Sequence, residues 1–348
     1  MLDLRHLIHN VEAVVANHNL GRSGAYRRWN WQKAATPAEK EDPARLTTAQ
    51  RDLGVNPYGC ADAANILYTI GRFPGDPRER QGWITTLQDL QNPQTGLFEE
   101  STHHPIHTTA HCVAALELFD ARPRFPLMEM HILRKPHEMA VFLETLNWRG
   151  NPWRESHRGA GLYAAMVLSG EVNMEWEEHY FAWLWEEADP ETGFWRKGQV
   201  GNVEAGETNS LFPHLAGSFH YLFNHEYAHR PLRYPAAMID TCLEIERSGQ
   251  FALGNRISFA EIDWVYCLTR ALRQSGHRFD EVHQALLSFA GRYIAFLNEV
   301  DPETDDDFND LHQLFGMVCC LAELQQTLPG LFRTQKPLKL VLDRRPFI

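Results

Sequence analysis

The 348-residue chain lacks the features that mark several classes of protein. No stretch approaches the ~18 uninterrupted apolar residues of a membrane-spanning helix. The N-terminus has no basic segment followed by an apolar one, so we expect no signal peptide. The net charge of −12 argues against nucleic-acid and anionic-membrane partners, because both require a basic protein surface.

Cysteine is also scarce. The six cysteines form no Cys-x-x-Cys pair, which argues against a structural zinc site. All six fall in segments with helical patterns, so we expect buried thiols in a reducing, cytoplasmic environment. What the chain does have is 44% hydrophobic residues, enough for a sizeable core, together with 18 histidines and 10 tryptophans. Histidine titrates nearest neutral pH, so its abundance is the feature to explain.

A pattern of about 50 residues repeats six times along the chain. Each copy has a polar start, small residues and an apolar run, with equivalent positions at Asp62, His111, Gly161, Ser218, Asp263 and His312. Amphipathic segments alternate with these copies at residues 4–17, 77–90, 136–146, 175–187, 235–246 and 280–297. The apolar copies predict buried helices, and the amphipathic segments predict half-exposed ones. We therefore predict one all-α domain over residues 1–348, an (α/α)6 toroid of six inner and six outer helices.

Two loops repeat a turn sequence, QNPQTGLF at 91–98 and DPETGFW at 189–195. The first loop and the following TAHCVAALEL at 109–118 resemble the repeats of terpenoid cyclases and protein prenyltransferases, and the turns resemble those of six-hairpin glycosidases. This resemblance implies a toroid fold. Two further stretches, at 263–267 and 310–316, are similar to the zinc-ligand segments of prenyltransferase β subunits. Val265 stands where that family has a cysteine ligand, so we assign no metal and no cofactor.

In such a toroid, the N-terminal ends of the inner helices line one mouth of a central cavity. His107 and His111 are four residues apart and share a helix face. Asp62 and Asp263 stand near the starts of buried helices, where a charge is costly unless it is paired or functional. The catalytic candidates are His107, His111, Asp62, Asp263, His157 and His312. The alternative for each is a helix cap or a hydrogen-bonded core residue.

Other polar, basic and aromatic residues near this mouth are candidates for substrate binding. They are Tyr58, His104, Trp153, Arg158, His214, Ser218, His220, Glu261, Trp29 and Trp31. The two last belong to residues 21–55, a long aperiodic stretch that we interpret as a lid, and residues 198–209 could act in the same way. Residues 328–348 contain three prolines and several basic residues, which predicts an arm on the surface.

These features favour an enzyme that acts on a carbohydrate, an acidic sugar or oligosaccharide, through histidine and carboxylate acid–base chemistry. Hydrolysis, elimination and epimerisation all remain open. One alternative is a terpenoid-cyclase-like or prenyltransferase-like protein that handles an isoprenoid. Another is a non-catalytic toroid that binds a peptide or protein partner. The expected ligand of the enzyme is a small molecule or oligosaccharide, and the sequence leaves the oligomeric state open.

Overall fold

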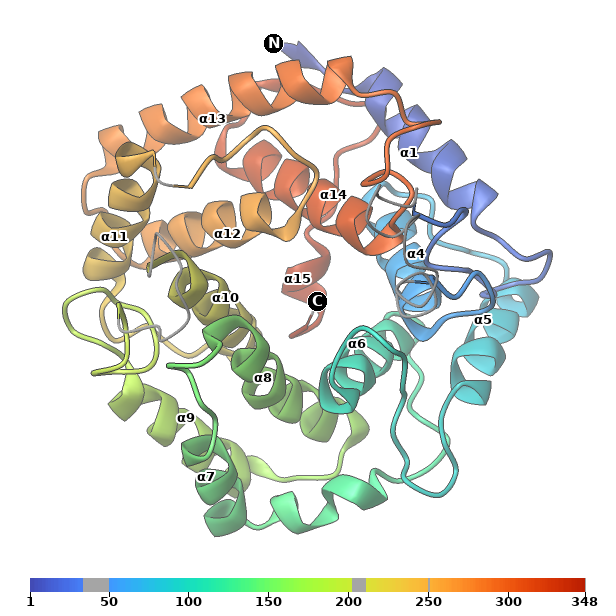
Figure 1. The fold of residues 1–348 in the computed structure, drawn as a ribbon, viewed down its shortest axis with the longest axis horizontal. Helices are drawn as coiled ribbons and strands as arrows, with labels where there is room; N and C mark the ends of the chain where they lie inside the picture. Colours follow the sequence, from blue (N-terminus) through green and yellow to red (C-terminus); the bar gives the residue numbers. More distant parts are fainter. Residues whose placement is uncertain (34–49, 202–210, 250, 348) are drawn as a thin grey trace, which may run out of the picture.

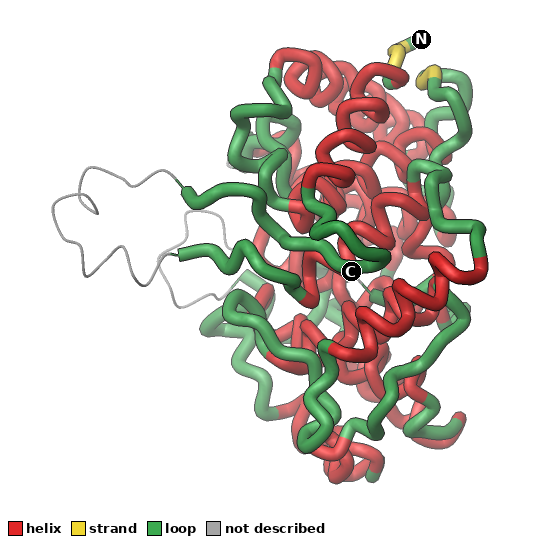
Figure 2. Tube along the Cα trace, turned by 90° about the vertical axis from the view of Figure 1, so that its right-hand side faces the viewer, coloured by secondary structure: helices red, strands yellow, loops and turns green. Residues whose placement is uncertain are grey.

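The computed structural model describes residues 1–33, 50–201, 211–249 and 251–347. Helices dominate this part of the chain, which confirms the all-α prediction. Two short strands, β1 (Leu2–Asp3) and β2 (Phe332–Arg333), pair in parallel beside the N-terminus (Figure 2). None of the described helices is long and apolar enough to cross a membrane.

Six helices of the described part of the chain are buried along most of their length and contact one another in a closed ring (Figure 1). They are α4 (Pro57–Thr69), α6 (Pro105–Leu118), α8 (Pro152–Ser169), α10 (Leu211–Tyr227), α12 (Phe259–Gln274) and α14 (Leu311–Thr327). Each packs against the next in this order, and α14 packs back against α4. These inner helices coincide with the six apolar copies of the sequence repeat, whose side chains have no polar face to offer to water.

A second set of helices surrounds the inner ring (Figure 1). It consists of α1 (Arg5–Asn17), α5 (Pro77–Asp89), α7 (Pro136–Glu144), α9 (Met174–Glu187), α11 (Pro235–Ser248) and α13 (Phe279–Glu299), with a 3-10 helix, η1 (Met128–Arg134), before α7. These helices bury one stripe each; on α13 it includes Val282, Leu286, Phe289 and Tyr293, spaced three or four residues apart. The predicted amphipathic segments are therefore confirmed as helices, with ends that differ by at most two residues.

Local sequence explains where several helices begin and turn. Asn56 precedes α4, and its side-chain oxygen accepts hydrogen bonds from the backbone N–H groups of Tyr58 and Gly59. The two similar loops contain Gly96 and Gly193 at φ values of +76° and +74°. A β-carbon at Gly193 would lie 2.7 Å from the carbonyl oxygen of Tyr234, so both backbone conformation and space require glycine there.

Residues 341–347, near the end of the chain, lie inside the inner ring (Figure 1). The short helix α15 (Val341–Arg344) contacts α10 and α4, and Arg345 and Phe347 are fully buried. The ring of Phe347 packs against His107 at a centroid distance of 4.8 Å and against Phe223 at 6.2 Å. The expected surface arm is therefore wrong for these residues: an apolar side chain at the end of the tail fills space between the inner helices.

The predicted lid falls only partly on described residues. Residues 34–49 and 202–210 lie outside them, so the lid expectation for both segments stays a prediction. Residues 21–33 are described and lie against the inner helices: Tyr26 and Trp29 are buried, and Trp29 forms a backbone bridge with Asp310.

Replacing Phe347 by alanine tests the packing of the tail. We expect Phe347→Ala to lower the free energy of unfolding by about 3–5 kcal/mol, because a buried aromatic ring is lost and a void remains. Urea denaturation measures this change. The matched control is Phe279→Ala at a ring that is 55% exposed, where the change should stay within about 0.5 kcal/mol. Equal effects of the two substitutions would contradict the buried position of the tail.

Candidate functional site

A cavity of about 700 Å³ opens at the N-terminal ends of the inner helices, and we call it the central cavity. Its size is that of a small-molecule site. Six histidines, three arginines and four aromatic residues contribute to its lining: His103, His104, His107, His157, His220, His312, Arg28, Arg154, Arg256, Trp153, Phe212, Phe251 and Phe259. Among the described lining residues there is no carboxylate. The cavity thus offers hydrogen bonds, positive charge and aromatic faces.

Asp62 joins two histidines at the inner side of this cavity. Its Oδ1 accepts hydrogen bonds from His111 Nε2 at 2.8 Å and from His312 Nδ1 at 3.1 Å. Asp62 and His111 are fully buried, whereas His312 reaches the lining of the central cavity. The carboxylate orients His312 so that its Nδ1 carries a proton and its Nε2 has a lone pair. An imidazole held in this way can accept a proton from a ligand.

Tyr58 stacks among the histidines. Its ring lies 4.2 Å from the ring of His103 and 4.8 Å from that of His111, measured between centroids, and it meets His312 edge-on at 4.7 Å. The Tyr58 hydroxyl forms a hydrogen bond with Nδ1 of His107. Tyr58 therefore connects the two histidine groups, one around Asp62 and one around His107.

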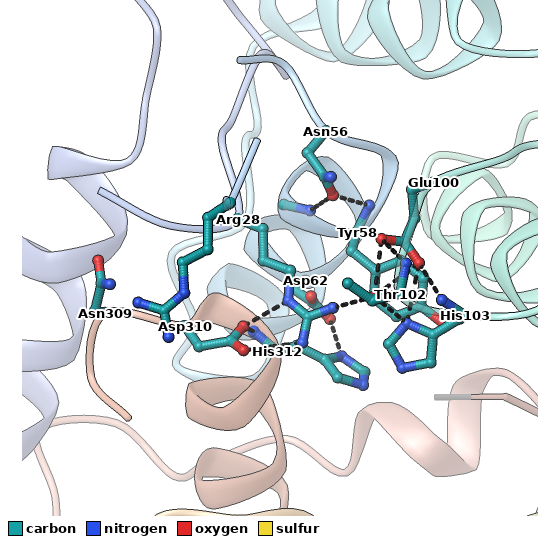
Figure 3. A network of polar contacts seen from close by, with 12 residues as sticks. Arg28, Asn56, Tyr58, Asp62, Glu100, Thr102, His103, Asn309, Asp310 and His312 are labelled. Atoms are coloured by element: carbon teal, nitrogen blue, oxygen red, sulfur yellow. Dashed lines mark hydrogen bonds and ion pairs between the residues drawn. The ribbon is translucent and has the colours of Figure 1, made fainter. Parts of the chain in front are cut away.

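Arg28 closes one side of the site (Figure 3). Its Nε and Nη2 bind the two oxygens of Asp310 at 2.7 and 2.8 Å, and its Nη1 donates to Thr102 Oγ1 at 2.8 Å. Asp310 in turn caps α14, because its Oδ1 accepts the backbone N–H of His312. This buried, two-point ion pair holds the segment before Trp29 against the start of α14. Gly59 permits the approach, since a β-carbon there would lie 2.6 Å from the backbone nitrogen of Arg28.

A second group brings His107, His157 and His220 together from α6, α8 and α10. The His157 ring lies between the other two, at centroid distances of 4.1 Å from His107 and 4.4 Å from His220. One ring nitrogen from each residue lies within 4.8 Å of the others. His220 Nδ1 also hydrogen-bonds Ser156 Oγ at 2.9 Å. Three ring nitrogens therefore converge on one place in the cavity wall.

Burial sets the protonation of these groups. It lowers the pKa of His107 and His157 well below the usual value and that of His220 to about 3, and the neighbouring histidines act in the same direction. Burial also lowers the pKa of His111 to about 4, although Asp62 opposes this. For Asp62, burial alone would raise the pKa, but the two imidazoles lower it below its usual range. At neutral pH these effects favour neutral rings at His107, His111, His157 and His220, and an ionised carboxylate at Asp62.

Other predicted site residues have different surroundings. Asp263 is buried on α12, and no described residue hydrogen-bonds its carboxyl oxygens. Glu261 accepts hydrogen bonds from Ser258 Oγ and from the backbone N–H of Gly254, so it holds the loop before α12 against the start of that helix. Ser218 Oγ accepts the backbone N–H of Trp195 at 3.1 Å.

Four more predicted residues lie outside the lining of the central cavity. Arg158 pairs with Glu155 at 2.9 Å, and His214 lies near Trp148. Trp29 lies under the guanidinium of Arg28, and Trp31 lines a separate cavity of about 240 Å³ beside α1. The predicted residues that do line the central cavity are His104, His107, Trp153, His157, His220 and His312.

Sequence reasoning missed several lining residues, of which the arginines matter most. Arg28 belongs to the basic and aromatic stretch at 26–31, and that composition was the available signal. Arg154 and Arg256 are exposed and pair with no described acidic residue. Neither lies at a repeated position of the sequence pattern, so no periodicity distinguishes them from other surface arginines.

Comparisons of the chain with protein-family models, curated proteins and solved structures found no match.

The buried Asp263 generates a pH prediction. Burial raises its pKa well above the usual value, and nearby Glu261 adds to this effect, so the folded protein keeps the carboxyl protonated. The stability that this group contributes is present below its unfolded pKa of about 3.9 and is lost as pH rises toward the folded pKa, by up to about 1.4 kcal/mol per pH unit.

We expect Asp263→Asn, which cannot ionise, to gain stability relative to the native protein as pH rises from 5 to 8. Urea denaturation at several pH values measures the difference in unfolding free energy between the two proteins. The comparison near pH 3 is the internal control, because the aspartate is then largely protonated in the unfolded chain and the asparagine is always neutral. A difference that stays constant across this range would contradict the raised pKa.

Proposed function

We propose that the chain is an (α/α)6-toroid enzyme that acts on an acidic sugar or oligosaccharide by proton transfer in the central cavity. The closed ring of inner helices, the surrounding amphipathic helices and the sequence resemblance to toroid repeats support the fold part of this proposal. One observation carries the chemical part: Asp62 holds His312 by a hydrogen bond, and His312 lines a cavity that is rich in histidine and arginine.

The charges around the cavity favour a substrate with a carboxylate. Arg28 is fully engaged by Asp310 and Thr102, so its guanidinium has a structural role. Arg154 and Arg256 make no ion pair with described residues and are available to a ligand. A guanidinium binds a carboxylate with two parallel hydrogen bonds, and the aromatic residues of the lining offer flat apolar surfaces for a sugar ring.

Within this class, elimination or epimerisation fits the lining better than hydrolysis. Glycoside hydrolysis uses two carboxyl groups that face each other across the scissile bond, and the described lining supplies none. Removal of a proton from the carbon beside a carboxylate instead needs a base and positive charge near the carboxylate. His312 Nε2 is the base, and Arg154 and Arg256 stabilise the negative charge that develops. In an elimination, the imidazolium formed at His312 returns its proton to the departing oxygen. In an epimerisation, a water molecule on the opposite face of the carbon supplies the new proton.

The first test is a substrate screen with uronic-acid oligosaccharides and, in parallel, isoprenyl diphosphates. Elimination produces a conjugated double bond that absorbs ultraviolet light, and epimerisation incorporates deuterium from heavy water at the reacting carbon. Hydrolysis produces new reducing ends without either signal. Conversion of an isoprenyl diphosphate alone would favour the terpenoid alternative, and conversion of neither class by the folded protein would contradict the proposal.

Variants then test the assigned base. We expect His312→Asn to lower kcat/KM by about 10²- to 10⁴-fold, because the proton acceptor is lost. Asp62→Asn should also lower kcat, because the imidazole is no longer held in one tautomer. Arg256→Ala should raise KM and also lower kcat, because its guanidinium both binds the carboxylate and stabilises the charge that develops on it. The matched control is His137→Asn at an exposed histidine, which should retain full activity. Circular dichroism verifies folding, and full activity of His312→Asn would exclude it as the base.

A further inference from the structure

We propose that His107, His157 and His220 form a binding site for one divalent transition-metal ion of the zinc type, in the wall of the central cavity. The three residues come from α6, α8 and α10, which pack side by side. One ring nitrogen of each lies within 4.8 Å of the other two, and all three side chains line the cavity. Zinc–nitrogen bonds are about 2.0–2.1 Å long, so tetrahedral ligands lie about 3.4 Å apart, and small ring movements bring the three nitrogens to that spacing.

The hydrogen bonds around His220 determine which of its nitrogens carries the proton. Ser156 Oγ donates its only hydrogen to the carbonyl oxygen of Trp153 at 2.6 Å. The same oxygen lies 2.9 Å from His220 Nδ1, and it must accept a hydrogen there because it has no second one to give. His220 Nδ1 is therefore protonated, and Nε2 has a lone pair. This is the tautomer of a metal-ligating histidine whose second nitrogen is held by an outer partner.

His107 has an equivalent outer partner. Its Nδ1 hydrogen-bonds the hydroxyl of Tyr58, which leaves Nε2 as the nitrogen for a ligand. The ring of Phe347 packs against the His107 ring at 4.8 Å and restricts its rotation. Two of the three histidines are thus held by contacts on their Nδ1 side, and His157 lies between them.

The charge state of the group suits a metal ion. Three imidazoles this close repel one another when they are charged, so the arrangement favours neutral rings whose nitrogens can bind a cation. The three side chains line the cavity, where a cation could bind one nitrogen of each together. Neutral nitrogen ligands select zinc, copper, nickel or cobalt over magnesium and calcium. A fourth position would face the cavity, as in three-histidine catalytic sites.

The group around Asp62 is a weaker candidate for the same ion. Asp62 Oδ1 already accepts hydrogen bonds from His111 Nε2 and His312 Nδ1, so both nitrogens that face the carboxylate carry protons. A metal would have to displace both protons and break both bonds. The group of His107, His157 and His220 has no such carboxylate, and its site does not depend on the proposed sugar chemistry.

The test uses the full chain after treatment with a chelator. Cobalt(II) titration followed by visible absorption, with zinc as competitor, reports affinity and coordination, and elemental analysis gives the stoichiometry. We expect one ion per chain and the absorption of a four- or five-coordinate cobalt site. His157→Ala and His220→Ala should weaken binding by more than about 100-fold, and Ser156→Ala, which removes only an outer partner, by about 10- to 100-fold.

The matched control is His312→Asn, which removes a cavity histidine of the other group and should leave metal affinity unchanged. Circular dichroism shows whether each variant is folded, and His157 is the safest position because its side chain is only partly buried. The proposal is overturned if folded native protein binds no stoichiometric ion, if His312→Asn abolishes binding while His220→Ala does not, or if every variant binds equally. These experiments measure metal binding and not catalysis, so their outcome does not depend on whether a sugar substrate is found.

Discussion

Six helices that are apolar on nearly every side can be buried only against one another, and this constraint shapes the whole molecule. Packing each against the next closes a ring of contacts. The starts of five of these helices then line a single cavity, and Tyr58 of the sixth lies directly behind it. Polar side chains at the helix starts, which are separated by about 50 residues in sequence, become neighbours. The concentration of histidine at the cavity is a consequence of this arrangement.

Burial then gives two similar sets of residues different chemical properties. In the first set, Asp62 accepts hydrogen bonds from N–H groups of both His111 and His312. The second nitrogen of His312 keeps its lone pair and can act as a base. In the second set, no described carboxylate is present, and the hydrogen bond between His220 Nδ1 and Ser156 leaves the lone pair of Nε2 for a ligand. The first set is suited to proton transfer and the second to binding a cation. Tyr58 contacts both sets, so a ligand in the cavity would meet them together.

Much of the helical structure was predictable because helix periodicity is a local property. The segment predicted at 77–90 is the helix Pro77–Asp89, and the segment at 280–297 lies within Phe279–Glu299. Asp62, His111 and His312 were chosen as equivalent positions of a repeat, and they are in contact. Arg28 and Phe347 were not found, since each lies in an irregular segment where no period indicates which side chains face inward. Asp263 shares the repeated position but none of these contacts.

By itself, the sequence determined the helices, their buried faces and the residue types at the start of each inner helix, because these depend on side chains a few positions apart. Only the tertiary structure decided which residues meet. Asp62 and His312 are 250 positions apart, and Arg28 and Asp310 are 282 apart. It also decided which nitrogen of His220 holds a proton, which depends on a serine of another helix. Such pairings depend on the packing of whole helices, and no local pattern of residues encodes them.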